Sequence, residues 1–367
     1  MVNRFLARAA PGIAELQPYV PGKPISELER ELGINHSIKL ASNENPLGPG
    51  PMARAAIAAA LDELALYPDG GGFELRNALA RHHGVDPACV TLGNGSNDVL
   101  DMIARVFLYP GAESLFAEHA FAVYPISSRA VGATLRVAPA HAYGHDLQAF
   151  RAALNADTRV IWIANPNNPT GTWLPAAELH AFIKEVPQDV IVVVDEAYFE
   201  YVDEAQYPDT SRWLGEFPNL VVTRTFSKAY GLAALRVGYG LSHPDVAALL
   251  NRVRQPFNVN ALAQAGAVAA LADRAHLERS VAVNRAGMRQ LAEGLAALGL
   301  DFIPSVGNFI TVDLDRPAGP VDQALLREGV ITRPIAGYGL PNHLRISVGL
   351  AEENARCLEA LRRLLGR

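Results

Sequence analysis

The length, composition and charge of the chain exclude several classes of protein. With 367 residues, 50% of them hydrophobic, the chain can bury a large core, and its length favours one large domain with a smaller one. The 38 acidic and 32 basic side chains leave a net charge of −6, and no run of Lys and Arg makes the local field positive. We therefore do not expect nucleic acid as a partner.

Cysteine usage and hydropathy indicate the cellular compartment of the protein. Cys89 and Cys357 have no second thiol or histidine at metal-ligand spacing, so we expect no metal site and a reducing compartment. The N-terminus carries Arg4 and Arg8 but no apolar stretch with a cleavage site, and no apolar run is long enough to span a bilayer. These features predict a cytoplasmic protein without membrane attachment.

The first part of the chain alternates helix-like and strand-like segments. The Pro-rich opening at 18–24 has too few apolar residues for a core of its own, and we expect it to pack against the C-terminal unit. Amphipathic stretches at 52–66 and 176–186 are candidate crossover helices. Short β-rich runs, apolar on both faces, lie at 89–92, 114–116, 160–163, 190–194 and 220–222. This alternation predicts an α/β fold with a mostly parallel central sheet.

The pattern changes after about residue 260. A long helical tract at 277–298 is followed by a strand-like segment at 308–312, a helix near 321–328 and a strand at 344–348. We therefore predict a smaller α+β domain formed from the chain termini. The expected divisions are an N-terminal arm and part of the small domain at 1–42, a large domain at 43–258 and the small C-terminal domain at 259–367.

Polar residues follow the predicted strands where ligands of open parallel sheets bind. The glycine turn before Ser96 and Asn97 opens a helix and can hold a phosphate on its backbone N–H groups, although an ordinary strand–helix connection also explains it. The turn lacks the third glycine of a dinucleotide fingerprint, because Asp98 stands there. The loop 165–171 presents prolines and asparagines, and taken alone it is also consistent with a simple turn.

Two further strand ends carry ionisable groups. Asp195 closes a buried aliphatic run, where it either caps the next segment or faces a cationic partner. Lys228 follows the strand run at 220–222, and Arg236 stands eight positions later. A lone lysine is usually a solvated surface amine. All four strand ends together suit pyridoxal-phosphate (PLP) chemistry, which needs a lysine for an imine, an acid for the pyridine nitrogen and donors for the phosphate.

These motifs resemble the class II aminotransferases among the fold type I PLP enzymes, and within them the subfamily that acts on histidinol phosphate. The resemblance covers nearly the whole chain. It rests on an ordered set of motifs at 19–24, 40–46, 67–70, 167–171, 195–198, 227–236 and 344–347. Two positions depart from the family pattern: Ala234 stands where a glycine is frequent, and Asn97-Asp98 replaces an acidic pair found in many relatives. The second departure weakens the role expected for Asn97.

The resemblance implies a role for each matching residue. Lys228 would carry the cofactor as a Schiff base and move the substrate proton, Asp195 would pair with the pyridine nitrogen, and Tyr198 would donate to the phenolic oxygen. Asn168 would donate to the same oxygen, and Phe121 would stack on the ring, unless it is a core aromatic. The cofactor phosphate would be held by Ser96, Asn97, Thr225, Ser227 and Arg236.

The resemblance also implies the substrate contacts and the assembly. Arg345 would bind an α-carboxylate, and Tyr19 with Arg333 would grip a phosphorylated arm, although Tyr19 is alternatively a packing residue and Arg333 a surface arginine. Asn43 and Glu44 lie on a segment that would close over the substrate. Tyr67 would reach the cofactor phosphate of a neighbouring subunit, which implies a homodimer with shared active sites.

Three functions remain open at this point. The first is transamination between histidinol phosphate and 2-oxoglutarate in histidine biosynthesis. The second is an aromatic amino-acid aminotransferase, and the third is a threonine-phosphate decarboxylase. A PLP-binding regulator is less favoured, because such proteins carry a DNA-binding domain ahead of this fold.

Overall fold

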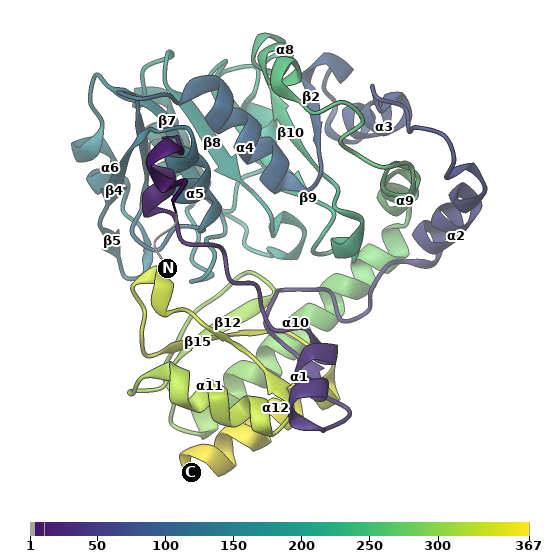
Figure 1. Ribbon diagram of the computed structural model, residues 1–367, viewed down its shortest axis with the longest axis vertical. Coiled ribbons are helices and arrows are strands. Elements are labelled where there is room, and N and C mark those ends of the chain that lie inside the picture. The colour runs from purple at the N-terminus through teal and green to yellow at the C-terminus, as the bar shows by residue number, and fades with distance from the viewer. Residues whose placement is uncertain (1–3, 11, 367) are drawn as a thin grey trace.

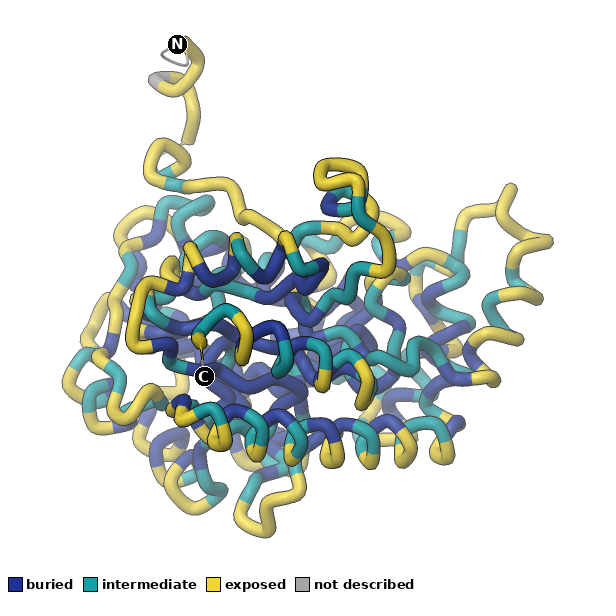
Figure 2. The backbone as a smooth tube through the Cα atoms, turned by 90° about the horizontal axis from the view of Figure 1, so that it is seen from below, coloured by how far each residue is buried: buried dark blue, intermediate teal, exposed yellow. Residues whose placement is uncertain are grey.

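A computed structural model describes residues 4–10 and 12–366 of the chain. The described residues exclude 1–3, 11 and 367. These positions belong to the expected terminal divisions at 1–42 and 259–367. Figure 1 shows a larger body built on a central sheet and a smaller body that contains the C-terminus. Figure 2 shows the N-terminal arm extending from these bodies as a largely exposed segment.

The larger body contains a seven-stranded sheet. Its strands, in spatial order, are β2 (Val90–Gly93), β10 (Gly238–Ser242), β9 (Leu220–Thr225), β8 (Ile191–Asp195), β7 (Thr158–Ala164), β3 (Glu113–Ala117) and β4 (Thr134–Ala138). The pairs from β9 to β4 are parallel, whereas β10 runs antiparallel to both β2 and β9. The prediction of a mostly parallel sheet is confirmed, and all five predicted strand runs belong to it.

Strand residues alternate between two hydrophobic clusters, one on each face of the sheet. Trp162 and Val193 pack on one face with α4 (Ser96–Phe107), α5 (Val123–Ala130) and α8 (Pro244–Val253). Ile163 and Val192 pack on the other face. The helices of that second face are α3 (Phe73–His83), α6 (Leu147–Ala153), α7 (Ala176–Glu185) and α9 (Ala261–Ala272). Because both faces are covered, the central strands are apolar throughout, as the sequence pattern indicated.

The structure confirms one of the two predicted crossover helices and contradicts the other. Helix α7 connects β7 to its parallel neighbour β8, which confirms the prediction for 176–186. The segment 52–66 forms α2 (Pro51–Ala60) and a short 3-10 turn, Leu61–Glu63. It precedes every strand of the large sheet and packs on α9, so the crossover prediction was wrong there. An amphipathic pattern predicts that a helix has one apolar face, but it does not predict which element packs against that face.

The smaller body has a four-stranded antiparallel sheet. Its order is β11 (Phe302–Ile303), β12 (Phe309–Asp313), β15 (His343–Ser347) and β14 (Arg333–Pro334). Its helices are α10 (Arg274–Ala297), α11 (Ala318–Arg327) and α12 (Ala351–Leu365). Strand β1 (Ile38–Lys39), which follows α1 (Ile25–Leu32), pairs in parallel with β13 (Val330–Ile331). A small hairpin, β5 (Ala140–His141) and β6 (Gly144–His145), completes the described strands.

The N-terminal arm contacts the C-terminal unit as expected, since Arg333 donates to the carbonyl of Val20 at 2.6 Å. Helix α9 lies beyond the expected boundary at residue 258 and packs with the larger body. The domain boundaries themselves stay a prediction. No helix within residues 4–10 and 12–366 is long and apolar enough to cross a membrane.

Candidate active site

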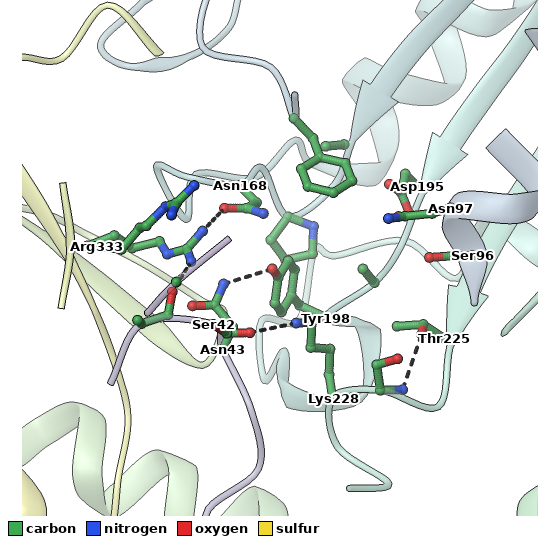
Figure 3. Close-up of a pocket in the computed structure, with 18 of the residues that line it drawn as sticks. Ser42, Asn43, Ser96, Asn97, Asn168, Asp195, Tyr198, Thr225, Lys228 and Arg333 are labelled. Carbon is green, nitrogen blue, oxygen red and sulfur yellow. Dashed lines mark hydrogen bonds between the residues drawn. The ribbon is translucent and has the colours of Figure 1, made fainter. Parts of the chain in front are cut away.

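A cavity of about 210 Å³ lies at the carboxyl ends of the parallel strands. One wall comes from residues at or after β7, β8 and β9, and the opposite wall comes from β14, β15 and the segment after β1. Figure 3 shows the side chains of both walls converging on a common space. Glu44 pairs with Lys39 at 2.8 Å and does not line the cavity. Apart from Glu44 and Tyr67, every site residue predicted from the sequence lines it: Tyr19, Asn43, Ser96, Asn97, Phe121, Asn168, Asp195, Tyr198, Thr225, Ser227, Lys228, Arg236, Arg333 and Arg345.

Asp195 is the last residue of β8, and its side chain is buried. Tyr124 donates to Oδ2 at 2.9 Å and Thr223 donates to Oδ1 at 2.8 Å. Burial raises the pKa of Asp195, while these two hydrogen bonds and the charge of Lys228 oppose the rise. The carboxylate is therefore fixed on both oxygens, and a cationic group placed in the cavity would stabilise its charged form.

Lys228 follows β9 and points into the same cavity. Its Nζ donates to the carbonyl of Ser42 at 3.0 Å, and no carboxylate of the described residues lies within ion-pair distance of it. Burial, and then the positive charge of Arg345, lowers the pKa of this amine to about 7. A large fraction of the amine is thus neutral near pH 7, and a neutral amine is a nucleophile.

A network of amides and hydroxyls joins the two walls. Arg345 donates from Nη1 to Oδ1 of Asn168 at 2.5 Å and from Nη2 to the carbonyl of Ala41 at 2.6 Å. Because Arg345 occupies Oδ1, the amide nitrogen of Asn168 remains the donor. Asn43 donates to the hydroxyl of Tyr198 at 2.9 Å, and burial raises the pKa of Tyr198 to about 12. The phenol is therefore protonated at neutral pH and can donate.

The far end of the cavity is suited to an anion. Ser96 begins α4. The preceding Gly95 has φ 83°, a positive value that residues with a Cβ rarely adopt. A Cβ at Gly95 would lie 2.5 Å from Nη2 of Arg236, so glycine lets the guanidinium approach the helix N-terminus. Arg236 also contacts the hydroxyl of Ser227 at 3.4 Å. The helix N-terminus and the arginine together form a phosphate-binding arrangement.

Tyr19 and Arg333 lie on the opposite side of the cavity. The guanidinium of Arg333 stands 5.5 Å from the ring centroid of Tyr19, and Arg333 is half-buried. Phe121 is half-buried and lines the cavity while also packing on a core cluster, so the two alternatives considered for it are compatible.

Tyr67 lies outside the cavity. Its side chain is 82% exposed, and it stacks on Phe257 with ring centroids 4.7 Å apart. The single chain does not bring it to the other predicted site residues.

Sequence reasoning missed some residues that the structure places at the site. Tyr124 on α5 holds Asp195 and stacks on Trp162, with centroids 5.2 Å apart. Thr223 directly follows the predicted strand run at 220–222 but received no role, and Ser42 supplies the carbonyl that holds Lys228. The β-strand period could have identified Thr223, because it shares a face with Thr225. No sequence signal identifies Tyr124.

Comparison with known proteins agrees with this geometry. The family model described as aminotransferase class I and II matches residues 35–363. The histidinol-phosphate aminotransferases 2 of Pseudomonas fluorescens (strain Pf0-1) and Pseudomonas aeruginosa are 60% and 61% identical, and the alignments cover 100% and 99% of both chains. A crystal structure of histidinol-phosphate aminotransferase from Sinorhizobium meliloti in complex with pyridoxal-5'-phosphate has a TM-score of 0.90 at 30% identity, covering 98% of each chain. The chain therefore belongs to the class I and II aminotransferase family.

Proposed function

We propose that this protein is a PLP-dependent aminotransferase of histidine biosynthesis. It would interconvert L-histidinol phosphate and 2-oxoglutarate with imidazole-acetol phosphate and L-glutamate. The observation that carries the proposal is one cavity lined by a buried carboxylate, Asp195, a half-buried amine of lowered pKa, Lys228, and an anion-binding helix N-terminus at the start of α4. The names of the relatives at 60% and 61% identity support the choice of substrate.

The residues of the cavity fit this cofactor. Ser96, Asn97, Thr225, Ser227 and Arg236 would hold the phosphate, and the tight approach of Arg236 to Gly95 supports that placement. Asp195 would hold the ring nitrogen in its protonated form, because a buried carboxylate is stabilised by a neighbouring cation. Asn168 and Tyr198 would donate to the phenolic oxygen, and Phe121 would cover the ring. When bound, PLP supplies an electron sink for the substrate carbanion.

Lys228 would do the proton transfer. Its amine is held by the carbonyl of Ser42 and is partly neutral near pH 7, so it can accept a proton from the substrate Cα and return it. Arg345 would bind the α-carboxylate of glutamate and 2-oxoglutarate, and its Nε is buried without a partner among the described residues. Tyr19 and Arg333 would bind the phosphate of histidinol phosphate. Asn43 would orient Tyr198.

The lowered pKa of Lys228 gives a pH prediction. Covalent capture of the cofactor needs the neutral amine, so the capture rate of the cofactor-free protein should rise about tenfold per pH unit below pH 7 and level off above pH 8. Stopped-flow absorbance after mixing with PLP measures this rate. With an ordinary lysine pKa the rate would instead keep rising up to about pH 10, and that result would exclude the depressed pKa.

We also propose that the protein acts as a cytoplasmic homodimer. An exposed apolar surface, here called the 52–73 surface, contains Met52, Leu61, Leu64, Leu66, Tyr67 and Phe73. Several exposed apolar side chains on one segment are typical of an interface, and twofold pairing of one patch is the commonest arrangement. Both cysteines are free, which agrees with a reducing compartment.

The dimer proposal is tested by complementation. Tyr67 would complete the phosphate site of the partner subunit, so Lys228→Ala and Tyr67→Ala proteins, each poorly active, should regain activity when unfolded and refolded together. Mixed dimers would then contain one site with both native residues. Lack of recovery, or a monomeric mass by sedimentation, would contradict the shared site.

The proposed substrate is tested by a spectrum of the purified holoenzyme with histidinol phosphate added. We expect loss of the absorbance of the lysine-bound cofactor, formation of pyridoxamine phosphate, and its reversal by 2-oxoglutarate. An unchanged spectrum with saturating donor would reject this substrate. Faster conversion by aromatic amino acids would favour the aromatic aminotransferase, and release of carbon dioxide from threonine phosphate without 2-oxoglutarate would favour the decarboxylase.

A further inference from the structure

The segment that follows Ser42 forms a turn that packs against the turn of Lys228. In the first turn, the backbone N–H of Gly48 donates to the carbonyl of Asn45 at 3.0 Å. In the second, the backbone N–H of Gly231 donates to the carbonyl of Lys228 at 2.9 Å. Gly231 has φ 70°, and a Cβ there would lie 2.1 Å from the carbonyl oxygen of Gly48. The two turns can therefore lie in contact because residue 231 is a glycine.

The side chain of Asn45 links the two turns. It is buried, and its Nδ2 donates to the carbonyl of Ala229 at 2.8 Å and to Oγ of Ser280 at 2.9 Å. Its Oδ1 accepts from the backbone N–H of Leu47 at 3.0 Å. A backbone carbonyl only accepts and a backbone N–H only donates, so these contacts fix the orientation of the amide. One side chain thus holds the backbone of the residue that directly follows Lys228.

The other partner of Asn45 belongs to the long helix α10. Figure 1 shows this helix extending from the larger body into the smaller one. Ser280 lies on α10, and His276 of the same helix donates from Nε2 to the carbonyl of Gly48 at 3.0 Å. The turn at 45–48 is therefore itself fixed. Because the carbonyl of Ser42 accepts from Nζ of Lys228, the segment 42–48 holds both the amine and the backbone of the lysine turn.

We propose that Asn45 is a positioning residue for Lys228. By fixing the backbone directly after Lys228, it sets the direction from which Nζ reaches the carbonyl carbon of the cofactor. Asn45 does not line the cavity, so it acts through Lys228 and not by touching the cofactor or the substrate. This inference rests on the proposed function, because it assumes that Lys228 captures PLP.

The experiment separates covalent capture from the other cofactor contacts. In capture, Nζ joins the aldehyde carbon of PLP with loss of one water, whereas pyridoxamine phosphate has no aldehyde and uses only the noncovalent contacts. Asn45→Ser should lower the rate at which the cofactor-free protein captures PLP above pH 8 by about tenfold, because a misplaced amine reacts more slowly. The dissociation constant of pyridoxamine phosphate should change by less than about twofold. Stopped-flow absorbance measures the rate, and titration calorimetry measures the dissociation constant.

Two variants of Asn45 and one matched control make the comparison specific. Serine can still accept from the backbone N–H of Leu47 but is too short to reach the carbonyl of Ala229, so Asn45→Ser keeps the turn. Asn45→Ala removes both contacts and should lose at least as much. Asn284→Ala is the control, since Asn45 and Asn284 are both 8% exposed, and Asn284 donates to the carbonyl of Gly307 at 3.1 Å, outside the lysine turn. Its capture rate should stay within about twofold of the wild type.

The possible outcomes distinguish the inference from the proposed function. An unchanged capture rate in both Asn45 variants, or equal losses for PLP and pyridoxamine phosphate, would overturn the positioning role while the proposed function stands. A similar loss in Asn284→Ala would assign the effect to weakened packing and would overturn that role too. A wild-type protein that captures no PLP would instead reject the proposed function, and this inference with it.

Discussion

Lys228→Ala is expected to lower kcat by at least about 10⁴-fold. The side chain would both hold the cofactor covalently and move the substrate proton, and general acid–base catalysis alone contributes about 10²–10⁴-fold. The variant should remain folded, because burial depresses the pKa of the amine and the charged amine therefore costs stability at neutral pH. Single-turnover kinetics with histidinol phosphate measure the loss.

Borohydride reduction followed by peptide mass spectrometry gives a second readout for this variant. In the wild type, the peptide that contains Lys228 should gain the mass of the reduced cofactor, and the variant should show no covalent cofactor at all. Lys184→Ala is the control, since Lys184 is an exposed residue of α7 and should leave activity within about twofold. A covalent cofactor on another lysine in Lys228→Ala would contradict the assignment.

The strand positions of the large sheet were predictable from the sequence because buried parallel strands are apolar on both faces. The two strands that sequence reasoning missed lack this signal. Strand β10 contains Gly238 and Gly240, which weaken a strand pattern, and β4 lies at the sheet edge with several exposed residues. A Cβ at Gly238 would meet the backbone nitrogen of Ser96 at 2.3 Å, so glycine there reflects the close packing of β10 on the start of α4.

The predicted site residues lie together because parallel strands bring their carboxyl ends to one edge. Motifs do not show which face a side chain occupies. Arg224 stands between Thr223 and Thr225, but strand alternation turns it away from the cavity, and it pairs there with Glu196 at 2.7 Å. Tyr124 was missed for a different reason, since it reaches the site through a tertiary contact that no spacing in the sequence encodes.

Asp195→Asn is expected to lower kcat by about 10²–10³-fold, the usual effect of removing a preorganised electrostatic contact. The amide has the shape of the carboxylate but no charge, so it would not keep the ring nitrogen of the cofactor protonated. Tyr124→Phe should have a smaller effect, about tenfold, because it removes one hydrogen bond from a charged group. Steady-state kinetics of the two holoenzymes measure both losses, with Tyr109→Phe as the control, since Tyr109 is 51% exposed and does not line the cavity.

The raised pKa of Asp195 also predicts that its replacement by Asn has opposite effects on activity and on stability. Burial raises the pKa of this carboxyl above its unfolded value, so its charged form costs stability at every pH above that value. Asp195→Asn should therefore raise the thermal midpoint of the cofactor-free protein at pH 7 and lower the affinity for the cofactor. In Tyr124→Phe the loss of a hydrogen bond should raise the pKa of Asp195 further and move the acid limb of the kcat profile to higher pH. If Asp195→Asn instead destabilised the cofactor-free protein, the carboxylate would be a structural cap, and the charge pairing assigned to it would be wrong.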